Sequence, residues 1–221
     1  MRRRALLALA ILLALGLGAV WGMGSLLMRP HPSAVATAVP PAEDFFLTTP
    51  DGLAIAATFW PGRDANAPAV LLLHGNGASR QAMAGNAAWL NAQGFAVLAI
   101  DFRGHGQSAP AMRSFGLHEA RDAAAAFAWL KQRQGGAPVA VVGISLGGAA
   151  SLLGEHGPLP ADALVLQAVY PDIRHAMRNC IASRSFGVVG WLAEPLLSLQ
   201  AWPRRRAVPR DGWCYASSGS R

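Results

Sequence analysis

The stretch Pro138-Val139-Ala140-Val141-Val142-Gly143-Ile144-Ser145-Leu146-Gly147 decides the fold class of this chain. Its apolar first half predicts a buried strand, and its second half is a G-x-S-x-G motif, typical of a tight strand-to-helix turn. Such a turn raises a nucleophilic serine above the sheet edge and leaves no room for side chains two residues to either side. Gly143 and Gly147 meet that requirement, and Gly148 lets the new helix pack close to the sheet. Ser145 is therefore the candidate nucleophile, and an ordinary glycine-rich turn is the alternative interpretation.

Two further motifs lie upstream in the chain. Leu71-Leu72-Leu73-His74-Gly75-Asn76-Gly77 is a buried strand that runs into a glycine-rich loop. Residues 95–100 form a second apolar run, which Asp101-Phe102-Arg103-Gly104-His105-Gly106-Gln107-Ser108 follows. The order H-G-N-G, D-x-R-G-x-G-x-S, G-x-S-x-G is far more specific than any one of the three motifs.

Together these motifs resemble those of the α/β-hydrolase family, close to the bacterial serine hydrolases described as serine aminopeptidase-like or lysophospholipase-like. The resemblance covers about residues 44–200. It implies cleavage of a carboxylic ester, thioester or amide through an acyl-serine intermediate, with a small-molecule or lipid-like acyl substrate. The oxyanion hole would use the backbone N–H of Leu146, just after the nucleophile, and by resemblance that of Asn76. The resemblance also implies that His74 shapes its loop and is not the base.

Hydrophobic patterning predicts a parallel sheet covered by helices on both faces, because strands alternate with helices along the chain. The predicted strands cover residues 43–49, 53–60, 68–73, 95–100, 138–142 and 163–169, and the predicted helices cover residues 80–93, 117–134 and 146–156. The first two strands form a hairpin around a Pro50-Asp51-Gly52 turn. Ligands in such folds bind at the carboxyl ends of the strands, where the three motifs fall. Asp101, Arg103 and His105 are expected to be loop scaffolding that includes an internal ion pair. The sequence has no metal-ligand spacing, and we expect no metal or cofactor.

The N-terminus predicts a membrane anchor. Three arginines precede residues 5–28, which carry no charge, and a helix needs about 20 residues to cross the hydrocarbon core. The arginines place the N-terminus inside, so the body is exported to the periplasmic or extracellular side as a single-pass protein. Residues 1–29 are thus an anchor or signal segment, and residues 30–42 are a linker. A cleavable signal peptide, cut near Ala36 or Ala38, is the alternative.

The net charge of +7 does not indicate nucleic-acid binding, because the charge lies at the two ends of the chain. Residues 1–29 hold four arginines and no acid, and residues 204–221 hold five arginines and one aspartate. The segment between them is left with a net charge near −1. The apolar N-terminal segment predicts a membrane as a partner, and the resemblance implies a small-molecule or lipid-like acyl substrate. The sequence does not predict an oligomeric state.

The C-terminal part lacks recognisable partners for Ser145. The fold orders its catalytic groups as serine, acid, histidine, yet no histidine follows His175. Asp172 and His175 would not easily reach Ser145 from one short segment. We expect a domain over residues 43–200, with the start of a cap at about 171–200 and a disordered basic tail at 201–221. The sheet would be truncated after the sixth strand and the hydrolase impaired, or the chain would be a non-catalytic membrane-tethered remnant or gene fragment. The sequence does not decide whether this chain is itself an active enzyme.

Overall fold

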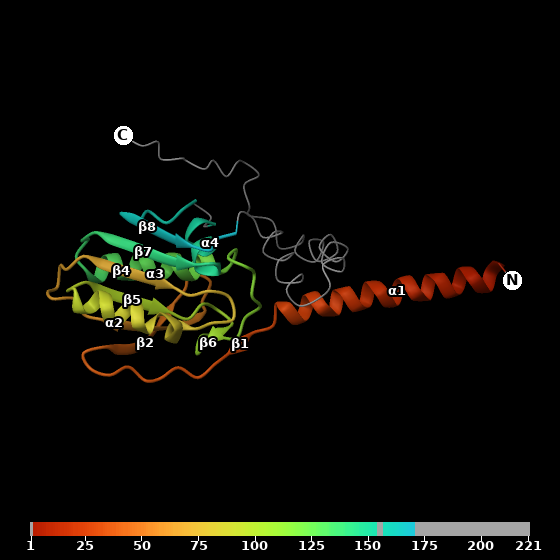
Figure 1. Cartoon of the computed structure of the whole chain (residues 1–221), viewed down its shortest axis with the longest axis horizontal. Helices are drawn as coiled ribbons and strands as arrows, with labels where there is room; N and C mark the ends of the chain where they lie inside the picture. The colour runs from red at the N-terminus through yellow and green to blue at the C-terminus, as the bar shows by residue number, and fades with distance from the viewer. Residues whose placement is uncertain (1, 154–156, 171–221) are drawn as a thin grey trace. The chain divides into compact units, whose positions relative to one another are not determined.

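A six-stranded sheet with the strand order β2-β3-β5-β4-β7-β8 forms the centre of the fold (Figure 1). The computed structural model describes residues 2–153 and 157–170. The strands are β1 (His31–Pro32), β2 (Glu43–Thr48), β3 (Ala54–Trp60), β4 (Ala69–Leu73), β5 (Ala96–Ile100), β6 (His105–Gly106), β7 (Val139–Ile144) and β8 (Ala163–Gln167). The helices are α1 (Arg2–Leu27), the 3-10 turn η1 (Arg80–Met83), α2 (Ala84–Ala92), α3 (Glu119–Arg133) and α4 (Leu146–Leu152).

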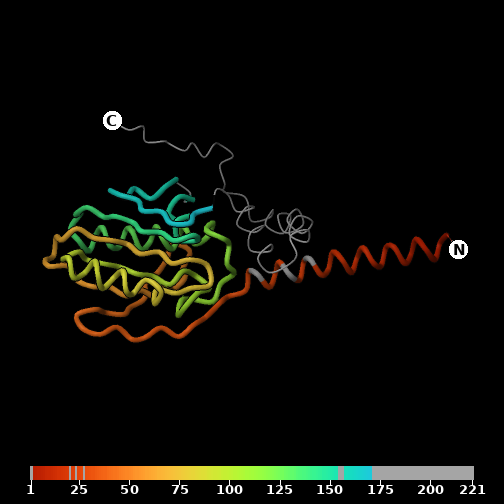
Figure 2. Tube along the Cα trace, viewed as in Figure 1, coloured from red at the N-terminus to blue at the C-terminus, as the bar shows by residue number. Residues whose placement is uncertain are grey.

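The sheet is mostly parallel, as predicted. Strands β5, β4, β7 and β8 run parallel, whereas β2 and β3 form an antiparallel hairpin that joins the sheet through an antiparallel pairing of β3 with β5. The predicted turn at residues 50–52 is confirmed, and the Thr49 N–H donates to Leu53 O at 2.9 Å. Figure 2 traces the chain from this hairpin to β8.

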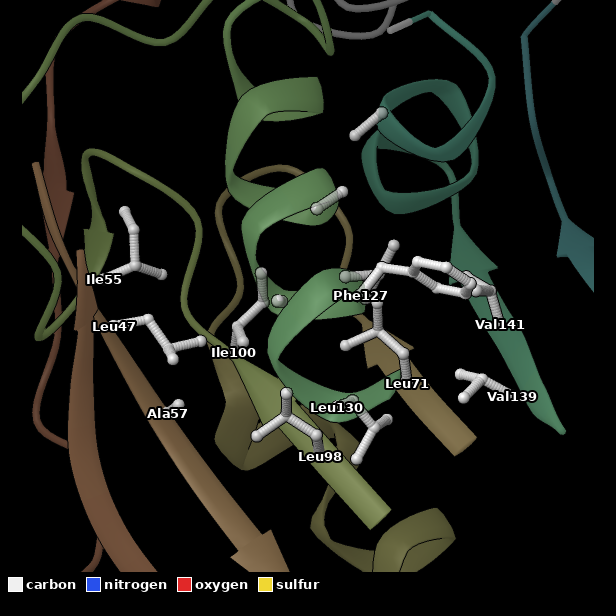
Figure 3. Close-up of a cluster of buried hydrophobic side chains, with 14 of the residues drawn as sticks. Leu47, Ile55, Ala57, Leu71, Leu98, Ile100, Phe127, Leu130, Val139 and Val141 are labelled. Carbon is white, nitrogen blue, oxygen red and sulfur yellow. The ribbon is translucent and has the colours of Figure 1, made fainter. Parts of the chain in front are cut away.

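Helices cover both faces of the sheet. Strand β4 is therefore buried along its whole length, and it is apolar at every position. Leu71 and Leu73 belong to a core cluster on the face covered by α3, which contributes Phe127 and Leu130 (Figure 3). The intervening Val70 and Leu72 belong to a second cluster with Met83 and Ala87 on the α2 side. Full burial of one such leucine stabilises the fold by about 1.5–3 kcal/mol. The two clusters explain the near-continuous apolar runs in the sequence, since each central strand is covered on both sides.

The predicted helix over residues 80–93 begins differently from the expectation. Its first turn is the 3-10 turn η1, and the α-helix starts only at Ala84. The Arg80 N–H donates to Asp101 Oδ1 at 2.6 Å, and the Arg80 side chain is buried. We attribute the tighter turn to these tertiary contacts, which the local sequence pattern does not encode.

The segment predicted as a linker pairs with the domain at one point. Within it, β1 runs parallel to β6, with His31 opposite His105 and Pro32 opposite Gly106. Before this segment, α1 reaches a mean hydropathy of 2.3, so its length and composition suit a membrane span. A signal sequence near the N-terminus would meet the same criterion. The predicted cap and tail, with Asp172 and His175, lie outside the described residues.

Strand β8 should be the least protected strand of the parallel group. Among the described residues it pairs only with β7, and its Leu164, Val165 and Leu166 are 37%, 56% and 40% exposed. Edge strands open more readily than strands paired on both sides. We therefore expect the β8 amides to exchange with deuterium well before those of β4. Equal protection of β4 and β8 in hydrogen-exchange mass spectrometry would contradict this expectation.

Candidate active site

Ser145 stands in a sharp turn between β7 and α4, with φ 49° and ψ −105°. A positive φ is uncommon for a residue other than glycine and costs on the order of 1–3 kcal/mol. The surrounding hydrogen bonds hold this conformation. The Ser145 N–H donates to Gln167 O at 2.8 Å, and the Ala149 N–H donates to Ser145 O at 3.0 Å. The serine is half-buried at the carboxyl end of β7.

The glycines of the turn are required by close backbone contacts. A Cβ atom at Gly143 would lie 2.6 Å from Gly148 N. One at Gly147 would collide with the Leu73 carbonyl group of β4, and one at Gly148 with the side chain of Val169. The predicted steric reason for the G-x-S-x-G spacing is thus confirmed.

The H-G-N-G loop lies directly beside Ser145. A Cβ atom at Gly75 would be 3.8 Å from Ser145 Cβ, so the loop backbone and the nucleophile are neighbours. The loop turns at Gly77, whose φ is +77°. The exposed Asn76 follows Gly75 in this loop, and Leu146 is the first residue of α4. The N–H of a first helical residue has no acceptor within its own helix. The structure therefore brings the segments of all three predicted site residues together.

His74 connects this loop to the segment after β5 through its two ring nitrogens. It is fully buried, its Nδ1 lies 2.7 Å from Gly75 O, and its Nε2 accepts a hydrogen bond of 3.1 Å from the Phe102 N–H. Burial lowers the pKa of His74 to about 3, so the ring is neutral and Nδ1 carries its proton. Since both ring nitrogens are engaged, His74 links the ends of β4 and β5 and is unsuited to act as a base.

The Asn76 side chain is held by two residues of the following loop. Arg113 donates from a terminal nitrogen to Asn76 Oδ1 at 3.0 Å, and His105 Nε2 lies 3.2 Å from the same oxygen. His105 Nδ1 lies 3.0 Å from Arg103 O. Burial lowers the pKa of His105, and a neutral imidazole has one N–H for these two oxygens. Arg113 was not predicted as a site residue, because it lies outside the three motifs.

Three ion pairs, made by the buried side chains of Arg80 and Arg103, fix the loop after β5. Asp101 pairs with Arg80, and Arg103 pairs with both Asp122 and Asp51, each at 2.7 Å. Hydrogen bonds from Arg103 lower the pKa of the Asp51 carboxyl. The predicted scaffolding role of this loop is confirmed, but the partners come from distant parts of the sequence and not from within the motif. Removing one member of such a buried pair typically costs about 3–5 kcal/mol.

Protonation of buried histidines should weaken the fold in acid. The ordinary pKa of histidine is about 6.5, so the unfolded chain takes up a proton at His74 that the folded chain excludes down to about pH 3. His105 acts in the same direction. The free energy of unfolding should therefore fall as the pH drops below about 6.5, by up to about 1.4 kcal/mol per pH unit for each proton. Urea titrations at several pH values give the free energy of unfolding of the parent and of His74→Asn. This free energy should fall less steeply with decreasing pH in the variant than in the parent. An identical pH dependence in the two proteins would contradict the account of His74.

Among residues 2–153 and 157–170, no group of three or more histidine, cysteine, aspartate or glutamate side chains could hold a metal ion.

The fold and the strained serine turn define this chain as an α/β-hydrolase of the serine type. Residues 64–209 match the family model described as serine aminopeptidase, S33, and the chain belongs to this family. The predicted family is therefore confirmed.

The curated relatives that match this chain are longer proteins, and one of them is named as a lipase. The chain is 37% identical over 124 residues to human protein ABHD12B, which is 53% of this chain and 33% of that protein. It is 32% identical over 118 residues to the lysophosphatidylserine lipase ABHD12 of Xenopus tropicalis, covering 51% and 30% of the two chains. The chain thus spans about a third of the length of the curated relatives that it matches.

Solved structures with the same fold include esterases. The Pyrococcus furiosus esterase Pf2001 superposes with a TM-score of 0.56 at 23% identity, over 77% of this chain and 68% of that one. The α/β-hydrolase GrgF of Penicillium sp. sh18 gives a TM-score of 0.53 at 23% identity, over 65% and 53%. At these identities the superpositions show the fold alone.

Proposed function

We propose that this chain acts on a carboxylic ester, thioester or amide through an acyl intermediate on Ser145. The observation that carries the proposal is the strained turn that presents Ser145 beside the backbone of the H-G-N-G loop. A turn of this kind costs stability and is retained where the serine must be exposed. A purely structural turn at this place would not need a glycine of the neighbouring loop so near to the serine that a Cβ atom there would lie 3.8 Å from Ser145 Cβ.

The proposed reaction has two halves. Ser145 Oγ attacks the acyl carbon and loses its proton to a base, while the N–H groups of Asn76 and Leu146 donate to the oxygen that becomes negative. The bond to the leaving group then breaks, the leaving group takes up the proton, and the acyl group stays on Ser145. Water attacks the acyl-serine in the second half and releases the carboxylic acid. Each oxyanion donor contributes on the order of 10²–10³ in rate.

The proposed reaction needs a base that takes the proton from Ser145. The histidines that follow Ser145 are His156 and His175, and both lie outside the described residues. Without a triad histidine, an oxyanion hole and substrate binding leave about 10³–10⁴-fold acceleration over water. We therefore propose that this chain, taken alone, acylates and deacylates slowly. A non-catalytic, membrane-tethered binding protein is the second candidate, and what favours it is that the described residues after Ser145 contain no histidine.

The proposed substrate is a lipid-like acyl compound. Support comes from the lysophosphatidylserine lipase relatives and from the long apolar helix α1. The test is a series of p-nitrophenyl esters from acetate to decanoate, with the second-order acylation rate constant as the readout. We expect the rate constant to rise with acyl length. A preference for acetate would argue for a small-molecule substrate.

We further propose that α1 anchors the chain as a single-pass span, with the arginines at its start inside and the domain exported. Carbonate washing of membranes at alkaline pH should leave the protein in the pellet, since a spanning helix resists extraction. A peripheral protein of the same membranes serves as the control and should be released. Recovery of a soluble form that begins near Ala38 would instead identify a cleaved signal peptide.

A further inference from the structure

The segment directly after α1, residues 28–33, is bound to the loop that carries β6 and Arg113. The Arg113 N–H donates to Met28 O at 2.9 Å, and Arg113 Nε donates to Arg29 O at 2.7 Å. The backbone of the same segment continues along the loop as β1. The His31 N–H donates to the loop carbonyl at position 104 at 2.6 Å. The Ser33 N–H donates to the loop carbonyl at position 106 at 3.0 Å.

Arg113 connects this segment to the H-G-N-G loop. One terminal nitrogen donates to Asn76 Oδ1 at 3.0 Å, while Nε of the same guanidinium holds Arg29 O. The planar guanidinium presents its donors in a fixed geometry, so both contacts are set by one rigid group. His105 also faces Asn76 Oδ1, but its single N–H has a second acceptor at Arg103 O. Arg113 is therefore the donor to Asn76 that depends on no tautomer.

The backbone that carries Arg113 is itself anchored. The N–H of the next residue, Ser114, donates to Glu119 Oε1 at 2.8 Å, and the Gly116 N–H donates to Glu119 Oε2 at 2.9 Å. Glu119 is fully buried at the start of α3. The backbone next to Arg113 is thus held by Glu119 of α3, and Arg113 itself is held by residues 28–33.

We propose that Arg113 is a positioning residue for the oxyanion loop, and that residues 28–33 hold it in place. The inference rests on the proposed roles of Asn76 and Ser145. The carbonyl of the Gly75–Asn76 peptide binds His74 Nδ1 at 2.7 Å and accepts from the Ala78 N–H at 3.2 Å, so these contacts hold one edge of the peptide that carries the Asn76 N–H. Residues 75 and 77 are glycines with free backbone conformations, and the side-chain contact of Asn76 with Arg113 holds the exposed side of this loop. A consequence is that proteolytic cleavage near Ala36 or Ala38 would remove residues 28–33 and weaken the site.

The test uses the full chain in detergent micelles and the variants Arg113→Gln, Arg113→Lys, Ser33→Pro and Asn76→Ala. Ser33→Pro removes the N–H that binds the loop at position 106 and leaves all site residues unchanged. The matched control is Arg63→Gln, since Arg63 forms an exposed ion pair with Asp64. Two quantities are measured for each: the maximal rate and half-saturating concentration of Ser145-dependent acylation by p-nitrophenyl butyrate, and deuterium uptake in residues 74–80.

Arg113→Gln should lower the maximal acylation rate about 10-fold, less than the loss of a whole oxyanion donor, and leave the half-saturating concentration unchanged. Uptake in residues 74–80 should rise several-fold, uptake in β4 should not, and Arg113→Lys should restore part of the rate. Ser33→Pro should have a smaller effect of the same kind. The double variant with Asn76→Ala should be no slower than the slower single variant, because Arg113 acts through that side chain.

Additive losses in the double variant, or parental rate and uptake in Arg113→Gln, would overturn the inference. A rise in uptake that is equal in residues 74–80 and in β4 would also overturn it, since it would mark general destabilisation. If Ser145→Ala acylates like the parent, the proposed function fails, and the uptake of residues 74–80 still decides whether Arg113 positions the loop.

Discussion

Replacing Ser145 with alanine should abolish covalent labelling of the chain by a fluorophosphonate probe. The probe phosphonylates a serine that can be deprotonated next to oxyanion donors, and the serine turn places Ser145 beside the H-G-N-G loop backbone. We expect the parent to label slowly, over hours, because residues 146–153 and 157–170, the described part of the chain after Ser145, contain no histidine. Gel fluorescence after timed incubation measures the effect. Ser25→Ala, which removes a hydroxyl group of α1, is the control and should label like the parent.

Two outcomes would revise this expectation. Labelling of Ser145→Ala at the parental rate would place the reactive group elsewhere. Rapid labelling of the parent, lost in Ser145→Ala, would mean that the chain supplies its own base. His175→Ala and Asp172→Asn would then identify it, since a loss of rapid labelling in either variant assigns the partner.

The second large effect is expected from Gly147→Ala. The added Cβ would collide with the Leu73 carbonyl in the central strand β4, which cannot move without breaking its ladders to β5 and β7. Overpacking of this kind costs about 1–3 kcal/mol and displaces the backbone that carries Ser145. Both the melting temperature and the labelling of Ser145 should therefore fall.

Gly85→Ala is the matched control for this substitution. Gly85 lies in α2, and a Cβ atom there would meet nothing within 4 Å. The change should stabilise the chain by about 0.5–1 kcal/mol through helix propensity and leave the labelling rate unchanged. Equal melting temperatures for Gly147→Ala and Gly85→Ala would contradict the steric account of the turn.

The sequence predicted the sheet, the serine turn and the loop beside it because each leaves a local pattern. Apolar runs mark strands that are covered on both faces, and the spacing of Gly143 and Gly147 is typical of the tight turn that carries Ser145. The two strands of the hairpin and helix α3 were found to within about two residues, the usual uncertainty at element ends.

The contacts that hold the site together were not predictable in the same way. Strands β1 and β6 have only two residues each, which is too few to show the alternation of apolar and polar residues by which a strand is predicted. Arg113 and Asn76 are 37 positions apart, and Arg103 and Asp51 are 52 positions apart. A single sequence contains no signal for such pairs, because each arginine is by itself compatible with an exposed position. The 3-10 turn at Arg80 has the same origin, since a distant aspartate sets the geometry of that turn.

The most direct test of the central claim is detection of the acyl group on Ser145. The chain is incubated with p-nitrophenyl butyrate, quenched in acid, digested and analysed by peptide mass spectrometry. Nitrophenolate leaves without being protonated, whereas water needs a base to attack the acyl-serine. Deacylation should therefore be slower than acylation, and the intermediate should accumulate. We predict a butyryl group on the peptide that contains Ser145, in an amount that matches the nitrophenol released in the first phase. Steady nitrophenol release with an unmodified Ser145, or a butyryl group on another residue alone, would contradict the account.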